Sequence, residues 1–185
     1  MKSKKQNPHT LDCQGLDNLV IFSRLLGYIR YFHPSDRAAE TNWEELAIRG
    51  VSIVETAQES TVLIEKLKTI FIPIAPTIHI FTTEELSTKS QTLQQQPNQN
   101  SLQLVTWEHS GVRGDMEEDF SIYYSKRVYH PITDELIATY QPFKADLGSG
   151  VSCLIPLALF VQDGKTLPHL PQTEIANPIN YSLSD

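Results

Sequence analysis

Hydrophobic residues in the first part of the chain recur at intervals of three and four positions, which is the spacing of an amphipathic helix. The first stripe begins near Leu16 and continues through Leu19, Phe22, Leu25, Leu26, Ile29 and Phe32. Pro34 should end this helix, because the residue before a proline is biased out of the helical region. The pattern therefore predicts one long helix from residue 16 to just before Pro34.

Two further helices are predicted downstream of this one. Residues 41–44, with the sequence TNWE, fit a capping box, in which Thr41 and Glu44 each satisfy a free backbone N–H. Gly50 lies inside the second helix, where glycine costs about 1 kcal/mol relative to alanine, so it indicates a close crossing with another helix. The third helix begins after Ser60 or Thr61, and the prolines at 73 and 76 end it.

From residue 77 the hydrophobic period changes to two, which is the signature of strands. Turn-forming residues separate the segments that are rich in β-branched, aromatic and aliphatic side chains. Pro156 lies inside the last of these segments, which argues for an edge strand or a bulge. The predicted strands are residues 77–82, 102–108, 120–128, 136–141 and 151–161.

Helices come first and strands second, which predicts an α+β fold in which an N-terminal three-helix segment precedes a mainly antiparallel β region. Polar, weakly hydrophobic stretches suggest the boundaries between its parts. We expect a disordered tail, a helical subdomain with one strand, a flexible linker or loop, a β-rich subdomain and a polar tail, at residues 1–15, 16–85, 86–101, 102–168 and 169–185.

The formal net charge of -7 makes nucleic acid and anionic lipid unlikely partners, because both are negatively charged. The chain has two cysteines, fewer than a disulfide scaffold or a clustered zinc site requires. It has no run of about 18 apolar residues, as a membrane span needs, and residues 6–15 are polar where an export signal is apolar. We therefore expect no cofactor, no metal and, for the chain as written, a cytoplasmic protein.

The sequence His33-Pro34-Ser35-Asp36 contains the three residue types of a hydrolase triad. Triads are assembled from positions that the fold brings together, and adjacent side chains do not reach the required geometry. We interpret these residues as a helix stop followed by a turn, in which Ser35 or Asp36 bonds to nearby backbone.

Aromatic and polar residues gather on the predicted sheet at Trp107, His109, Tyr123, Tyr124 and Arg127. Such residues are common in recognition surfaces, and they are equally common in half-buried sheets. No catalytic residue is predicted. The residues that we predict to bind a partner are His33, Trp107, His109 and Arg127.

Several phrases of this chain resemble the non-catalytic N-terminal region of bacterial C-terminal-processing (tail-specific) serine peptidases. The longest phrase is residues 18–36, NLVIFSRLLGYIRYFHPSD, and a Trp-led helix with the letters NWE follows it. The resemblance spans residues 18–168, and its other phrases are residues 71–77, 107–111, 124–128, 147–151 and 155–157.

The resemblance implies a non-catalytic accessory module that contacts a substrate or partner. In that family the catalytic Ser and Lys lie in a separate downstream domain, so no catalytic residue carries over to this chain. The implied partner is a protein or peptide, including a peptidase catalytic domain, and the family is often exported. An exposed apolar patch is expected where such a domain would sit.

Two alternatives remain open at the level of sequence. The first is a stand-alone protein-interaction module, or a truncated peptidase relative without activity. The second is an independent hydrolase, which requires His33 or His109 to meet a serine or a carboxylate across the fold.

Overall fold

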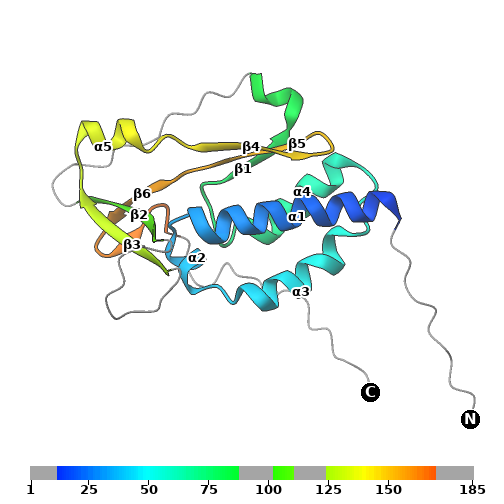
Figure 1. Ribbon diagram of the computed structural model, residues 1–185, viewed down its shortest axis with the longest axis horizontal. Coiled ribbons are helices and arrows are strands. Elements are labelled where there is room, and N and C mark those ends of the chain that lie inside the picture. The colour runs from blue at the N-terminus through cyan, green and yellow to red at the C-terminus, as the bar shows by residue number, and fades with distance from the viewer. Residues whose placement is uncertain (1–11, 88–101, 111–123, 170–185) are drawn as a thin grey trace, which may run out of the picture.

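The computed structural model describes residues 12–87, 102–110 and 124–169 (Figure 1). Helices α1, α2, α3 and α4 come first, at Cys13–Phe32, Asp36–Glu40, Trp43–Val54 and Ser60–Phe71. Strand β1 (His79–Thr82) and a short 3-10 helix η1 (Thr83–Ser87) follow. The remaining elements are β2 (Gln103–Ser110), β3 (Tyr124–Pro131), α5 (Asp134–Thr139), β4 (Phe143–Gly148), β5 (Val151–Ile155), β6 (Ala158–Gln162) and β7 (Lys165–Thr166).

The predicted α+β class is confirmed, with the helices ahead of the strands. The described strands form two antiparallel sheets, one in the order β1-β5-β4 and the other in the order β3-β2-β6-β7. We call them sheet A and sheet B. Figure 1 shows α1 in the middle of the molecule, between the strands of sheet A and helix α3.

The chain passes from sheet A to sheet B at Pro156, and here the sequence prediction was wrong. Residues 151–161 were predicted to be one strand at an edge or with a bulge, whereas the structure has two strands, β5 and β6. Both lie inside their sheets, because β5 has neighbours β1 and β4 and β6 has neighbours β2 and β7. The proline falls between the two ladders, where its missing N–H removes no sheet hydrogen bond.

Helix α1 begins at Cys13, three residues before the predicted start, so the predicted disordered tail overlaps the helix. The side chain of Asp12 accepts a hydrogen bond from the Gly15 amide at 2.7 Å and caps the helix. The helix ends at Phe32, just before Pro34, as predicted. Residues 1–11 lie outside the described part of the chain.

The predicted capping box at residues 41–44 is also corrected. Asn42 caps α3, accepting a hydrogen bond from the Glu45 amide at 3.2 Å. The Thr41 hydroxyl instead donates to the Arg37 carbonyl at 2.6 Å, because the unpredicted helix α2 ends at this point. The predicted third helix is confirmed as α4, which begins at Ser60.

Residues 136–141 were predicted to be a strand and are largely helical. Thr133 caps α5 by accepting a hydrogen bond from the Leu136 amide at 3.1 Å. This cap starts a helix whose residues Leu136 and Ile137 pack onto sheet B, so local capping overrode the strand-like composition. The next strand, β4, was not predicted. Of the predicted strand at residues 120–128, the last five belong to β3, and residues 120–123 lie outside the described ranges.

The main core lies between the helices and sheet A. It joins the inner faces of α1 and α4 to strands β1 and β5, and thus unites residues from both predicted subdomains. The linker predicted at residues 86–101 is described only at its first two positions, in η1, and at residues 88–101 it falls outside the described residues. The largest fully buried side chains of this core are Phe22, Phe71, Ile21, Leu25, Ile29, Leu63, Leu67, Leu147, Ile155 and Val54.

The predicted close crossing at Gly50 is confirmed. A methyl group at this position would overlap ring carbons Cζ and Cε2 of the buried Phe22 on α1. Near this crossing the Asn18 side chain, fully buried, donates to the carbonyls of Val54 and Ala57 at 3.0 and 2.8 Å. These bonds tie α1 to the C-terminal end of α3, where the Val54 carbonyl also accepts from the Ala57 amide at 3.1 Å.

Among the described residues, none of the helices is both long enough and apolar enough to span a membrane.

Candidate functional site

The four residues predicted to bind a partner lie near one another, where α1 and α2 meet sheet B. His33 follows α1, Trp107 and His109 lie on β2, and Arg127 lies on β3 opposite Trp107. Residues 105, 107 and 109 share one face of sheet B with residues 125, 127 and 129, because cross-strand partners point to the same side. This face is turned toward the ends of α1 and α2.

His33 is fully buried, and its ring contacts two hydroxyl groups. Nδ1 lies 3.1 Å from Ser35 Oγ, and Nε2 lies 2.8 Å from Thr77 Oγ1. Burial lowers the pKa of His33 from 6.5 to about 3, because the charged imidazolium would lose its hydration. The ring is therefore neutral at physiological pH and joins the turn that contains Ser35 to the segment that contains Thr77.

The Ser35 hydroxyl makes hydrogen bonds to two backbone groups. Its Oγ donates to the Ile74 carbonyl at 2.7 Å and accepts from the Ala38 amide at 3.2 Å, capping α2. Because the hydroxyl proton is directed to Ile74, the imidazole proton of His33 is placed on Nδ1 and Nε2 accepts from Thr77. The Ser35 amide is also near Nδ1, but its 3.4 Å approach is the weaker contact.

Asp36 connects α2 to sheet B through both carboxylate oxygens. Oδ1 accepts from Arg127 Nη2 at 2.6 Å, and Oδ2 accepts from the Thr166 amide and hydroxyl at 2.7 and 3.0 Å. Burial alone would raise the pKa of Asp36, but the hydrogen bonds from Thr166 and Arg127 together outweigh burial and hold the pKa below its usual range. The carboxylate is thus charged and fixed.

Trp107 completes this connection by donating its indole N–H to the His33 carbonyl at 3.1 Å. We call residues 33–36, together with Thr77, Trp107, Arg127 and Thr166, the joint. The prediction that Ser35 or Asp36 bonds to backbone is confirmed, although Asp36 bonds to backbone 130 residues away along the chain. The joint links α1, α2, the segment before β1, and strands β2, β3 and β7.

Replacing Asp36 by asparagine should lower the free energy of unfolding by about 2 kcal/mol, because Arg127 would keep its charge in a site where its side chain is 14% exposed. Urea denaturation measures this change. Glu65→Gln is the control, since it breaks an exposed ion pair with Lys68 and should cost less than about 0.5 kcal/mol. Equal effects of the two substitutions would contradict a structural role for Asp36.

The joint contains a histidine next to a serine, as a hydrolase requires, but its geometry does not suit nucleophilic catalysis. The Ser35 proton is donated to a carbonyl, and the His33 ring is sealed from solvent. A base whose conjugate acid has a pKa of about 3 also accepts protons poorly at neutral pH.

The second histidine also has a serine within reach. His109 Nδ1 lies 2.8 Å from Ser125 Oγ, and the two residues are directly opposite each other in the β2–β3 ladder. The His109 contact therefore meets the requirement of the hydrolase alternative for a serine across the fold, whereas Ser35 lies two residues from His33 in the same turn. The His109–Ser125 contact is one between neighbouring side chains on one face of a sheet, and the His109 ring lies among aromatic rings.

These rings form a row beside the joint, which we call the aromatic row. The centroid of the His109 ring lies 6.2 Å from that of Trp107, 5.7 Å from Phe32 and 6.4 Å from Tyr31. Phe32 in turn lies 6.0 Å from Phe143 on β4. Tyr31 and Phe32 are 40% and 38% exposed. Neither residue was predicted to bind a partner. Phe32 was instead assigned to the hydrophobic stripe of the first helix, and Tyr31 is its neighbour in the chain.

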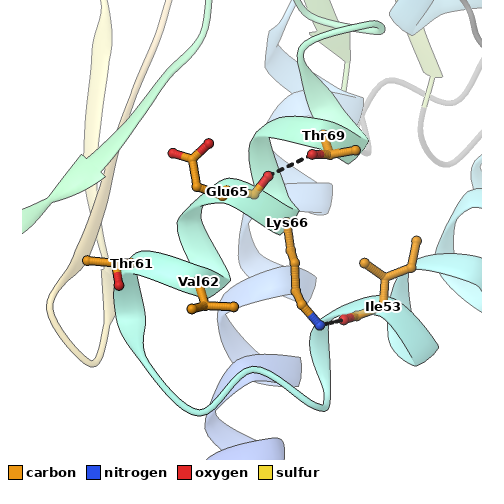
Figure 2. A pocket seen from close by; sticks show the side chains of 6 residues that line it. All are labelled: Ile53, Thr61, Val62, Glu65, Lys66 and Thr69. Carbon is orange, nitrogen blue, oxygen red and sulfur yellow. Dashed lines mark hydrogen bonds between the residues drawn. The ribbon is translucent and has the colours of Figure 1, made fainter.

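A hollow of about 440 Å³ lies on the opposite side of the helical layer, between α3 and α4 (Figure 2). Ile53 and Val62 line it, and Lys66 reaches across to donate to the Ile53 carbonyl at 2.6 Å. Ile48 on α3 is 74% exposed. Exposed apolar side chains therefore occur on α3 as well as at the end of α1, and an expected partner surface at either place stays a prediction.

The described residues contain no group of three or more metal-ligating side chains close enough to hold an ion. Comparisons with family models, with curated proteins and with solved structures found no match. The functional argument therefore depends on the geometry of the joint and of the surfaces around it.

Proposed function

We propose that this chain is a non-catalytic module that contacts a protein or peptide partner, in the manner of the N-terminal region of a tail-specific serine peptidase. The observation that carries the proposal is the state of His33, Ser35 and Asp36. Each of these side chains is buried or partly buried, and each is committed to hydrogen bonds that hold the fold together. These three polar residues, which lie in the longest segment that resembles the peptidase family, therefore stabilise the fold.

The surface around the joint supports the contacting role. Tyr31 and Phe32 are exposed at the end of α1, and Tyr129 is exposed on the same face of sheet B, with the Arg127 guanidinium 5.7 Å from its ring centroid. Aromatic residues and arginine are enriched in protein interfaces and among the residues that contribute most to binding.

Purified chain should not cleave a fluorogenic peptide or casein above the background of substrate alone. It should also not react with a fluorophosphonate, which labels activated serines. Ser35→Ala and Ser125→Ala are the diagnostic variants, because these serines contact His33 and His109. Cleavage or labelling that one of these substitutions abolishes would overturn the proposal in favour of a hydrolase.

The contacting role is tested by retention of a partner on immobilised chain. A double variant with Tyr31→Ser and Phe32→Ser should lose the partner, whereas Ile48→Ser on α3 should keep it. A peptidase assay on the recovered partner, with and without the chain, then distinguishes an accessory of a peptidase from a stand-alone interaction module. Retention that neither surface substitution affects would count against the aromatic row as the contact.

A further inference from the structure

The two sheets have four edges, and they differ in how well they could accept another strand. Three are short or irregular: β1 has four residues, β7 has two, and β4 has six with a register shift between Asp146 and Gly148. The fourth edge is β3, which has eight residues and pairs with β2 without any shift from Tyr124 to Pro131. A long regular edge is a template for strand addition.

Among the described strands, β3 pairs with β2 alone, and Figure 1 shows it at the outer border of the molecule. Residues that alternate along an edge strand direct their backbone N–H and C=O groups away from the sheet. Peptide-binding domains that work by strand addition use such groups for affinity and the side chains of alternate residues for specificity.

Proteins commonly protect long edges with central prolines, bulges or free charges. In β3 the proline stands at the last position, and the register has no bulge. Arg127 is turned inward to Asp36 at 2.6 Å. Lys126 is half exposed, and its ammonium lies 3.3 Å from the similarly exposed Glu108 and 5.8 Å from the ring centroid of Tyr124. Surface contacts of this kind are weak, so an incoming carboxylate can compete for the ammonium.

We infer that the free edge of β3 binds an extended, acidic segment of a protein partner, which adds to sheet B as a fifth strand. This inference rests on the proposed function and names the partner surface. Charge identifies the occupant: Arg127 is already paired with Asp36, which leaves the half-exposed Lys126 as the charge on a strand that has no carboxylate of its own. Tyr124 and Tyr129 are 41% and 45% exposed and lie on opposite faces of the strand, so each can pack on an alternate side chain of the added segment.

A second copy of this chain fits the edge less well. When two copies of β3 pair as antiparallel strands about a two-fold axis, the residue on the axis lies directly opposite the same residue of the other copy. A register centred on Lys126 places the ammonium groups of the two copies opposite each other. Like charges in directly opposed positions destabilise a strand pair, whereas an acidic segment supplies the opposite charge.

The test uses the full chain, labelled with nitrogen-15, and two blocked eight-residue peptides. One alternates glutamate with valine, and the other alternates lysine with valine. The acidic peptide should shift the amide resonances of residues 124–130 and bind about tenfold more tightly than the basic one. Lys126→Glu should reverse this preference. Lys144→Glu on β4 makes the same charge change on another strand and should leave the preference unaltered.

Lys126→Gln provides a variant without added repulsion from Glu108, and it should bring the two peptides closer in affinity. The inference is overturned if neither peptide binds, if both bind equally to the unaltered chain, or if the shifts lie on α3 and α4. Shifts in β3 that grow with chain concentration in the absence of peptide would assign the edge to self-association and overturn it also. If neither peptide binds β3 but partner binding still depends on Tyr31 and Phe32, the β3 site is wrong and the proposed function stands.

Discussion

Gly50→Val should lower the free energy of unfolding by about 3 kcal/mol, at the upper end of the cost of overpacking a core. A side chain at this position would collide with the ring of Phe22. Phe22 is 2% exposed and packs on Phe71 with ring centroids 5.7 Å apart, so its ring has no free space into which to move. The clash therefore outweighs the gain in helix propensity from replacing glycine by valine, which is less than about 0.5 kcal/mol.

Gly27 on α1 provides the matched control. A methyl group there has no atom within 4 Å, so Gly27→Ala should raise the free energy of unfolding by about 0.5–1 kcal/mol through helix propensity alone. Phe22→Leu should recover part of the loss caused by Gly50→Val, because it removes the ring that clashes. Urea denaturation of the four chains decides the matter. A stabilising Gly50→Val would contradict the close crossing of α1 and α3.

Acidification should destabilise the fold through His33 by roughly 3 kcal/mol between pH 7 and pH 4. The pKa of the folded state is lowered to about 3, from 6.5, so below pH 6.5 the unfolded chain binds a proton that the folded chain does not. The stability supplied by the neutral ring is complete above pH 6.5 and is lost as pH falls toward the folded pKa. Each pH unit in this window corresponds to about 1.4 kcal/mol.

The contribution of His33 is isolated by comparison with His33→Gln, which keeps a polar group at the site and does not titrate. The difference in free energy of unfolding between the two chains should favour the natural chain at pH 7 and shrink steadily toward pH 4. Measurements stop at pH 4 because protonation of Asp36, whose pKa is also lowered, destabilises the fold in the same direction below that point. A difference that does not vary with pH would show that the His33 ring titrates alike in both states.

Sequence periodicity predicted the elements whose stability is local. The end of α1 before Pro34 and the start of α4 at Ser60 each follow from residues within a few positions. The crossing at Gly50 was indicated by the glycine itself, although its partner Phe22 lies on another helix. The errors arose where a cap or a proline outweighed composition. The cap at Thr133 starts helix α5 in a segment whose composition is strand-like. Pro156 separates two strands in different sheets, where one strand was predicted.

The joint could be predicted only in part. The turn at residues 33–36 was recognisable, but its partners were not, because Thr77 is 44 residues from His33 and Arg127 is 91 residues from Asp36. No local pattern encodes such distances. Of the four residues predicted to bind a partner, His33, Trp107 and Arg127 belong to the joint, while the exposed neighbours Tyr31 and Phe32 were not predicted to bind. A binding role for each of the four stays a prediction.

The claim that the joint is architectural is tested most directly by nuclear magnetic resonance titration of the His33 ring. Between pH 5 and pH 8 the folded chain should show a neutral imidazole with its proton on Nδ1, whereas the same ring in the urea-unfolded chain should titrate as an ordinary histidine. A His33 ring that takes up a proton near pH 6.5 in the folded chain, or whose signals move when a serine-reactive phosphonate is added, would contradict the account.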